Sequence, residues 1–244
     1  MKLLEVLSVT KKFGSLTAVD NATLVINQNE IVGLIGPNGS GKSTLLHTIC
    51  GRTFATEGKI LLEGSEITNK APQLRAIAGM AIKFQLARIY LEKTVKENLL
   101  ISLQAKESIW NQLLSRTLKS FEQKILDLAE EFQLEDYLNE PAKSLSHGQQ
   151  QWLEIAMAMA SNPILLLLDE PTAGMSPKER ADTAVLIKKA STKCGILIVE
   201  HDLDFIKEIC NRISVLHQGN VIATGTPAEI ENDPKVKEVY LTRV

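Results

Sequence analysis

The sequence is poor in cysteine and has no long apolar run, and each absence removes a class of protein. Three cysteines occur among 244 residues, at Cys50, Cys194 and Cys210. Their odd number and scattered positions fit neither a disulfide framework nor a metal-binding spacing, so we expect reduced, buried thiols in a cytosolic protein. No apolar run approaches the ~18 residues that a membrane-spanning helix requires.

An excess of charge of one sign is also missing. The 27 lysines and arginines nearly balance the 29 acidic residues, which leaves a net charge of -2 and no electrostatic basis for binding nucleic acid. A secretory signal is not expected either, because Glu5 lies where such a signal would be apolar. Any role at a membrane would therefore depend on partner proteins.

What the sequence has is an alternation of strand-like and helix-like segments. Apolar and β-branched runs predict strands at 3–10, 22–27, 30–35, 57–63, 164–168 and 196–199. Residues from about 86 to 145 differ, because they carry helical patterns opened by a capping box at Thr94 and Glu97 and show little strand signal. We therefore expect a single α/β domain at 1–244, with a core at 1–85 and 146–244 and an inserted helical subdomain between them.

A glycine-rich stretch separates the strand at 30–35 from a helix that starts near residue 42. It consists of Gly36, Pro37, Asn38, Gly39, Ser40, Gly41, Lys42, Ser43 and Thr44. The glycines let successive backbone N–H groups face a phosphate chain, and the helix N-terminus adds its dipole. Lys42 supplies a positive charge between the β- and γ-phosphates, and the Ser43 hydroxyl can ligate Mg²⁺. The stretch predicts a P-loop that binds ATP with Mg²⁺ rather than a plain glycine turn.

Two acids follow the apolar strand at 164–168. Asp169 would emerge at the carboxyl end of a buried central strand, where α/β proteins bind ligands, and could reach the Mg²⁺ through water. Glu170 lies one residue further and can orient an attacking water. A buried strand followed by acids is common by itself, but together with the P-loop it predicts a site that hydrolyses a phosphate bond.

Residues 145–149 read Leu-Ser-His-Gly-Gln and precede a helix. Ser146 and Gln149 have the spacing of a capping box, so one interpretation is simply a helix start. The other interpretation is a phosphate sensor, because the serine hydroxyl, the Gly148 N–H and the helix dipole all suit an anion. The spacing from the other two motifs favours the sensor. His147 within it could face that anion or solvent.

These motifs occur in the order typical of the ABC ATPase family, which the chain resembles over essentially its whole length. The P-loop is followed by Gln85, the helical segment, the 145–149 stretch, Asp169-Glu170-Pro171 and Glu200-His201-Asp202. The resemblance implies a P-loop NTPase core with an antiparallel β subdomain and the inserted helical subdomain. It also implies ATP hydrolysis, in which Glu170 polarises water and His201 holds the γ-phosphate.

The resemblance assigns further residues to the nucleotide. Phe13 stands where an aromatic ring stacks on adenine, and Val19 would line the same face. Gln85 looks like the glutamine that touches Mg²⁺ and signals to a membrane subunit. The chain departs from the family pattern at His147, where glycine is usual, at Phe13, where tyrosine is more frequent, and at 171–177, which lack the usual aspartate.

An assembly is implied as well. Each ATP would lie between the P-loop of one subunit and Ser146 to Gln149 of a second ATPase subunit, in a homodimer or a heterodimer. Membrane permease subunits, served indirectly by an external solute-binding protein, would hold the pair peripherally at the cytoplasmic face of the inner or plasma membrane. Leu86, Ile89, Tyr90 and Leu91 form an apolar loop that we expect to grip a permease helix, although they could instead pack inward.

The transported solute is predicted by resemblance alone. Residues 149–155 and the tail at 232–241 resemble the uptake group for branched-chain amino acids and urea, and the combination is most similar to the urea type. We therefore expect import of urea or short amides, with a branched-chain amino acid importer as the alternative. A soluble ABC ATPase acting on ribosomes or DNA is less consistent with a chain that has neither a second ATPase domain nor a coiled coil. A nucleotide kinase would not need the 145–149 stretch.

Overall fold

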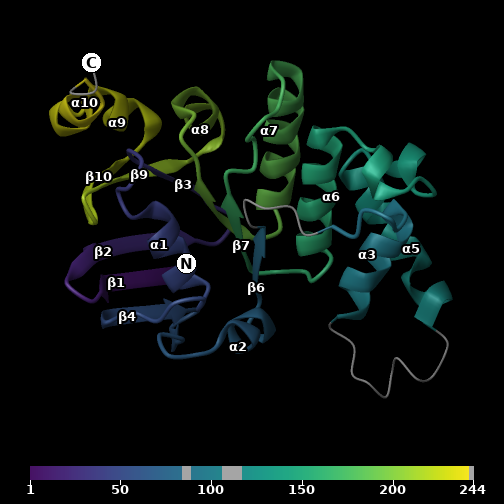
Figure 1. Cartoon of the computed structure of the whole chain (residues 1–244), viewed down its shortest axis with the longest axis horizontal. Helices are drawn as coiled ribbons and strands as arrows, with labels where there is room; N and C mark the ends of the chain where they lie inside the picture. Colours follow the sequence, from purple (N-terminus) through teal and green to yellow (C-terminus); the bar gives the residue numbers. More distant parts are fainter. Residues whose placement is uncertain (84–88, 106–116, 242–244) are drawn as a thin grey trace. The chain divides into compact units, whose positions relative to one another are not determined.

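The computed structural model describes residues 1–83, 89–105 and 117–241 (Figure 1). The chain folds into two compact units. The first comprises Met1–Ile82, Ile164–Glu170 and Ile187–Val244, and the second comprises Lys83–Pro163 and Pro171–Leu186. Across the described ranges, no helix is both long enough and apolar enough to span a membrane.

A six-stranded sheet carries the P-loop and the two acids of the first unit. Its strands are β3 (Ile31–Ile35), β6 (Met80–Lys83), β7 (Leu165–Asp169), β8 (Gly195–Val199), β9 (Arg212–His217) and β10 (Asn220–Gly225), in the order β10-β9-β3-β8-β7-β6. β3 pairs in parallel with β8 and β9, and β8 pairs in parallel with β7, whereas β10 is antiparallel to β9. Every residue of β3, β7 and β8 is buried, as central strands covered on both faces require.

A second sheet of the same unit is antiparallel. It contains β1 (Lys2–Phe13), β2 (Leu16–Asn27), β4 (Glu57–Leu62) and β5 (Ser65–Glu66), in the order β2-β1-β4-β5. Figure 1 shows the purple strands β1 and β2 beside the blue strand β4. Alternate side chains such as Leu24 and Ile26 of β2 are buried, which is the pattern of a sheet with one face on the core. The antiparallel β subdomain that the resemblance implied is therefore present.

The helices of the first unit include α1, which starts at the P-loop and is held at its far end by a buried arginine. They are α1 (Lys42–Ile49), α2 (Pro72–Ile77), α8 (Leu203–Ile209), α9 (Pro227–Asn232) and α10 (Pro234–Leu241). Arg75 of α2 is 1% exposed and donates to the backbone oxygens of Thr48 (2.8 Å) and Ile49 (2.6 Å), at the end of α1. It also donates to the oxygens of Thr68 and Lys70. The carbonyls that a helix end leaves unpaired are thus satisfied by a charged donor.

The second unit is helical. It contains α3 (Val95–Gln104), α5 (Thr117–Glu131), short 3₁₀ turns at Glu135–Tyr137 and Ala142–Ser144, α6 (His147–Met159) and the beginning of α7 (Pro177–Ser191). α3 contacts both α5 and α6. The indole N–H of Trp152 in α6 donates to the Thr183 hydroxyl of α7 at 2.8 Å.

The helical unit extends beyond the predicted boundaries of about 86–145. Helix α6 directly precedes strand β7 in the chain, so the alternation of the sequence assigned it to the core. Its packing against α3 and its bond from Trp152 to Thr183 instead join it to the helical unit. This difference matters for function, because the 145–149 stretch then belongs to the second unit and the P-loop to the first.

Candidate functional site

The P-loop connects β3 to α1, and its path depends on two glycines. A Cβ atom on Gly36 would lie 2.1 Å from the backbone oxygen of Leu216. Gly41 caps α1 with φ 103°, and a Cβ atom there would lie 2.3 Å from the backbone oxygen of Ala18. Because both obstacles are backbone atoms that cannot swing aside, only glycine fits at either position.

Lys42 and Ser40 carry polar groups of this loop. The Lys42 ammonium donates to the backbone oxygens of Gly36 (2.8 Å) and Pro37 (3.0 Å), so the side chain folds back over the loop. The hydroxyl oxygen of Ser40 is buried and has no hydrogen-bond partner within the part of the chain that the structure describes. A buried, unsatisfied hydroxyl calls for an explanation, and a ligand phosphate bound by the loop amides would supply one.

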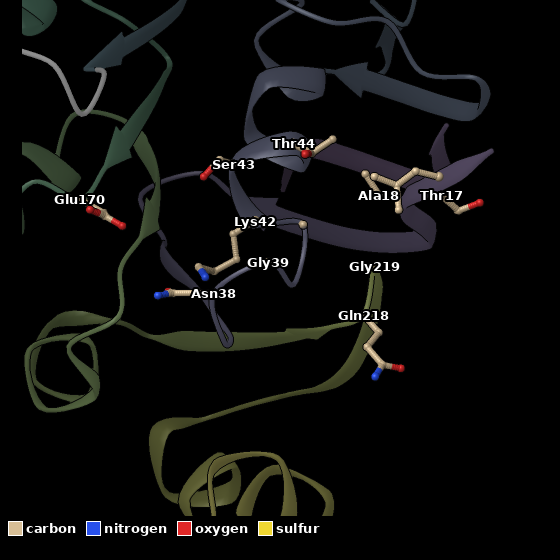
Figure 2. Close-up of a pocket in the computed structure, with 12 residues that line it drawn as sticks. Thr17, Ala18, Asn38, Gly39, Lys42, Ser43, Thr44, Glu170, Gln218 and Gly219 are labelled. Atoms are coloured by element: carbon tan, nitrogen blue, oxygen red, sulfur yellow. The ribbon is translucent and has the colours of Figure 1, made fainter. Parts of the chain in front are cut away.

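The loop borders a cavity of about 580 Å³, which is the size expected for a small-molecule site (Figure 2). Its lining residues are Leu16, Thr17, Ala18, Asn38, Gly39, Gly41, Lys42, Ser43, Thr44, Glu170, Gln218 and Gly219. Figure 2 shows Lys42 and Ser43 pointing toward the side where Glu170 lies, with Thr17 and Gln218 at the opposite side. The P-loop residues and the acid after β7 therefore share one space.

The start of one strand and one turn, neither selected by the sequence analysis, complete this cavity. Thr17 lies at the start of β2, and Gln218 and Gly219 form the tight turn between β9 and β10, with φ 47° and 83°. The Gly219 N–H donates to the backbone oxygen of Ser40 at 2.9 Å, and its own oxygen accepts from the Asp20 N–H at 2.9 Å. These bonds bring distant parts of the chain to the P-loop. A Gln-Gly pair between two strands signals a turn, but no local signal says where that turn lies.

The two acids lie at the carboxyl end of β7. Asp169 is the last residue of β7 and is 5% exposed. Glu170 follows in a left-handed conformation, φ 46°, while its N–H donates to the backbone oxygen of Val199 at 2.9 Å. Strained backbone in a non-glycine residue concentrates at functional sites. Here it accompanies the only acidic side chain among the described residues that line the cavity.

His201 lies beside the same acid. Its Nδ1 atom is 3.9 Å from Oε1 of Glu170 and 3.6 Å from Oε2 of Glu200. Glu200 is buried and also accepts the His201 backbone N–H at 3.1 Å, whereas the imidazole is exposed. Because β7 and β8 are parallel neighbours, the residues that follow them emerge at one edge of the sheet, which is why Glu170 and His201 meet.

Oxygen donors suited to Mg²⁺ are also present in the first unit. Ser43 lines the cavity with a hydroxyl, and Asp169 ends the buried strand β7 with a carboxylate. No group of three or more His, Cys, Asp or Glu side chains in the described ranges could hold a metal unaided. Mg²⁺ commonly binds through one or two protein oxygens plus substrate phosphates, so these residues fit an ion that arrives with a nucleotide.

The second unit holds the 145–149 stretch at the N-terminus of α6. The Ser146 hydroxyl accepts the Gln149 N–H at 3.2 Å, and the Gln149 side-chain oxygen accepts the Ser146 N–H at 2.9 Å. The predicted capping box is therefore formed. The same hydroxyl donates to Oε1 of Glu179 at 3.2 Å. The group that would sense phosphate is thus already engaged by a carboxylate of its own chain.

His147 is exposed at the start of α6, which agrees with the solvent-facing interpretation, and its ring also contacts its own chain. Its side chain is exposed, but Nε2 lies 3.0 Å from the backbone oxygen of Ala173, in the turn that follows Glu170 and Pro171. Gly174, at φ 75°, lies against the ring, since a Cβ atom there would be 3.3 Å from Nε2. The ring therefore ties the start of α6 to this turn within one subunit.

Comparison with known proteins decides the family. The ABC transporter model matches residues 19–173, and the branched-chain amino acid ATP-binding cassette transporter model matches residues 220–241. This chain belongs to the ABC transporter family. It is 37% identical to BraF, the high-affinity branched-chain amino acid transport ATP-binding protein of Pseudomonas aeruginosa, over 98% of this chain and 97% of BraF. It is 35% identical to LptB, the lipopolysaccharide export ATP-binding protein of Haemophilus influenzae, over 99% and 98% of the two chains.

A solved structure agrees with this membership. The ADP conformation of an ATP-binding cassette of an ABC transporter superposes with a TM-score of 0.88 at 33% identity, covering 99% of each chain. The predicted P-loop NTPase fold of the ABC ATPase type is confirmed, and the subunit is an ATP-hydrolysing enzyme that binds adenine nucleotide.

The urea-type assignment is not supported. The match at 220–241 and the similarity to BraF both point to branched-chain amino acids, which was the alternative that the sequence left open. The motifs could not separate the two, because in the assembly that the resemblance implied the solute passes through other subunits.

Two predicted adenine contacts of this ABC ATPase have different outcomes. Phe13 ends β1 with 48% of its surface exposed, and the Lys11 ammonium lies 4.8 Å from the centre of its ring. Its stacking on adenine stays a prediction. Val19 is completely buried in β2, so it has no surface to offer a base. Thr17 and Ala18, earlier in the same strand, line the cavity instead.

The expected docking loop is described only in part. Gln85 and Leu86 lie outside the described residues. Ile89 is half-buried, whereas Tyr90 and Leu91 are 53% and 47% exposed. The buried Asn98 braces the loop, since its amide oxygen accepts the Tyr90 N–H at 2.8 Å and its amide nitrogen donates to the Tyr90 oxygen at 3.1 Å. The loop therefore presents two apolar side chains on a fixed backbone.

Proposed function

We propose that this ABC ATPase energises the import of branched-chain amino acids. The observation that carries the proposal is the match of residues 220–241 to the branched-chain amino acid cassette, together with similarity to BraF along nearly the whole of both chains. The matched tail is well defined: α9 begins at a capping box of Thr226 and Glu229, and Asp233 accepts the N–H groups of Lys235 and Val236 at the start of α10.

Overall identity alone does not select the solute. LptB, named for lipopolysaccharide export, is almost as similar to this chain as BraF is. All three are ATP-binding subunits of transport systems, whereas the model matched at 220–241 is described as that of the branched-chain amino acid cassette. The import assignment therefore depends on the tail, and export of a lipid-linked cargo is the competing outcome of the test below.

Within the subunit, the P-loop would hold the nucleotide and the edge of the sheet after β7 and β8 would hydrolyse it. The loop amides, the α1 dipole and Lys42 would bind the phosphates, and Ser43 with Asp169 would hold Mg²⁺, which neutralises phosphate charge. Glu170 would polarise the attacking water. His201, whose Nδ1 lies 3.9 Å from the Glu170 carboxylate, would hold the γ-phosphate against it.

A second ATPase subunit would complete each site. Ser146 and Gly148 at the start of α6 offer a hydroxyl and a backbone N–H to an anion, in a unit of the chain that is separate from the P-loop. In a head-to-tail pair, of identical or similar subunits, these donors would contact the γ-phosphate bound to the partner's P-loop. ATP would then hold the pair closed and hydrolysis would reopen it.

Permease subunits would link this engine to the membrane at its cytoplasmic face, with an external solute-binding protein delivering the amino acid. The exposed Tyr90 and Leu91 on their braced loop are suited to grip a permease helix.

Tyr90→Asp should leave the isolated subunit folded and able to bind ATP but weaken its co-purification with the permease. Tyr137→Asp, at a tyrosine exposed on the 3₁₀ turn of the same unit, is the matched control and should co-purify normally.

The import proposal is tested in vesicles that contain the subunit with its permeases, ATP inside and a loaded solute-binding protein outside. Radiolabelled leucine should accumulate with ATP, urea should not, and the Glu170→Gln subunit should bind ATP yet lose at least about 10²-fold in transport. Accumulation of urea instead of leucine, or ATP-driven release of lipid, would replace the proposed solute.

A further inference from the structure

Three helices of the described chain begin with a capping box that has a glutamate at its third position. The boxes pair Thr94 with Glu97 at α3, Ser176 with Glu179 at α7, and Thr226 with Glu229 at α9. In α9 the Glu229 carboxylate accepts the Thr226 N–H at 2.7 Å and the Thr226 hydroxyl at 2.9 Å, both from its own cap residue. Such a carboxylate serves only the helix that it caps.

Glu179 serves a second helix as well. Its Oε2 atom accepts the Ser176 N–H at 2.9 Å and the Ser176 hydroxyl at 2.8 Å, which is the ordinary capping box. Its Oε1 atom accepts the hydroxyl of Ser146 at 3.2 Å and lies against the backbone of Gly148. One carboxylate thus joins the N-termini of α7 and α6, both within the second unit.

Gly148 makes room for this contact. A Cβ atom on Gly148 would lie 2.5 Å from Oε1 of Glu179, which is closer than real Cβ contacts allow. The carboxylate therefore approaches the backbone of α6 more closely than any side chain at this position would permit. An anion at the first turn of α6 is also favoured by the helix dipole.

The donors keep this carboxylate ionised. The N–H and hydroxyl of Ser176 lower the pKa of Glu179 most, and the Ser146 hydroxyl and the Gly148 N–H lower it further. At neutral pH the negatively charged carboxylate of Glu179 therefore lies against Ser146 and Gly148. The proposed function places the γ-phosphate of the partner's ATP at these same two residues.

We propose that Glu179 is an internal anion that engages Ser146 and covers Gly148 of the 145–149 stretch in the resting subunit, and that it must leave both before the partner's nucleotide can bind. The inference rests on the proposed function, because it needs the head-to-tail pair. A hydroxyl has one proton and a backbone amide has one, so neither group can donate fully to a carboxylate and a phosphate together. Two anions at one helix start also repel each other.

Release need not unfold the helix start. Oε2 of Glu179 can stay on Ser176 while the rest of the carboxylate turns away from α6, because the two sets of donors lie on different helices. The contact then acts as a two-state element that biases the free subunit against closure. Because closure of the pair needs both subunits, donors that are free in about a third of resting subunits would reduce the apparent affinity of closure about tenfold, and abolishing the contact would restore it.

Glutamine at position 179 separates the charge from the cap. Glutamine forms capping boxes as glutamate does, and the chain itself uses Gln149 in that role at α6. Glu179→Gln should therefore keep α7 capped while removing the negative charge from Ser146 and Gly148. Glu229→Gln removes the same charge from the capping box of α9, whose hydrogen bonds go to Thr226. It therefore controls for the loss of a cap charge alone.

The contact itself is read in the isolated full-length chain from the amide NMR signal of Gly148. The signal should shift in Glu179→Gln and not in Glu229→Gln, and in the parent it should titrate with a midpoint below the ordinary glutamate pKa of 4.5. A Gly148 amide signal that is unchanged in Glu179→Gln would overturn the proposal, because the carboxylate would then not lie at that amide.

Closure is measured by sedimentation of the full chain with ATP and Mg²⁺, in a Glu170→Gln background that prevents hydrolysis. We expect Glu179→Gln to lower the subunit concentration at half-dimerisation about tenfold, with Glu229→Gln unchanged. If the parent dimerises and Glu179→Gln dimerises equally or more weakly, the inference about Glu179 is overturned while the head-to-tail pair stands. ATP binding without dimerisation in the parent and in every variant overturns the head-to-tail pair, and the inference with it.

Discussion

The N-termini of α1 and α6 carry the two halves of the proposed phosphate chemistry, and the chain treats them in opposite ways. Helix α1 starts at Gly41, has no side-chain cap and no acid in its first turn, and borders a cavity of about 580 Å³. Helix α6 starts at Ser146 with a complete capping box, and Glu179 lies on its first turn. One helix start leaves its amides to a ligand, whereas the other satisfies its donors within the chain.

The difference teaches how an uncapped helix start is kept stable. The cost of leaving the first amides of α1 without a cap is of the order of 1 kcal/mol. Arg75, at the other end of the same helix, provides charged hydrogen bonds to the last carbonyls. Hydrogen bonds thus stabilise α1 at the end that is away from the ligand. In α6 they stabilise the same end that would bind the partner's phosphate.

The largest contrast is expected when the same substitution is made at both helix starts. Gly41→Ala places a Cβ atom 2.3 Å from a backbone oxygen and forces an alanine to φ 103°, so nucleotide binding by the isolated chain should fall at least about 100-fold or the fold should fail. Gly148→Ala meets only side-chain atoms of Glu179, from Cγ to Oε1, and this side chain can swing away. Its affinity for a fluorescent ATP analogue should equal that of the parent, and a loss as large as that of Gly41→Ala would contradict the comparison.

The buried arginine at the far end of α1 gives the next effect. Arg75→Ala removes four hydrogen bonds to backbone oxygens and should lower the free energy of unfolding by about 3 kcal/mol. Arg75→Lys keeps a charge but lacks the planar fork that reaches several carbonyls, so its loss should be intermediate. Denaturant unfolding monitored by circular dichroism measures the stability of both variants. If Arg75→Ala is as stable as the parent, Arg75 does not stabilise the end of α1.

The smallest effect concerns acid stability. The backbone N–H of the cap residue is the largest cause of the lowered pKa at Glu97, Glu179 and Glu229; Lys93 comes next at Glu97, and the cap hydroxyl comes next at Glu179 and Glu229. A depressed folded-state pKa contributes stability above the unfolded value near 4.5, and this contribution is lost as pH falls through the folded value. The triple variant with glutamine at these positions should therefore show a slightly smaller drop in urea midpoint between pH 6 and about pH 3. Helix α1, with no acid in its first turn, should add nothing to this difference.

The parts of the site that could be predicted from the sequence are those with local causes. The P-loop, Asp169, Glu170 and His201 each lie at or just after the carboxyl end of a buried parallel strand, and the order of such strands places their ends together. The contact of Glu179 with Ser146 could not be predicted, since it links residues 33 positions apart through the packing of α6 and α7. Gln218 and Thr17 reach the cavity in the same non-local way.

The boundary of the helical unit and the placement of Val19 illustrate the same limit. Both were assigned from position along the chain, and both were changed by packing: α6 joins α3, and Val19 turns into the core. A strand pattern fixes which side chains share a face, but only the assembled sheets decide which face meets the ligand.

The central claim, that the starts of α1 and α6 form one ATP site across two subunits, is tested most directly by mixing two defective chains. Lys42→Ala disables the P-loop and Ser146→Ala disables the 145–149 stretch, so each variant alone should hydrolyse almost no ATP. In an equal mixture half of the dimers are mixed and each has one intact site, so phosphate release should recover to about a quarter of the parental rate. A mixture no more active than the separate variants would contradict the claim.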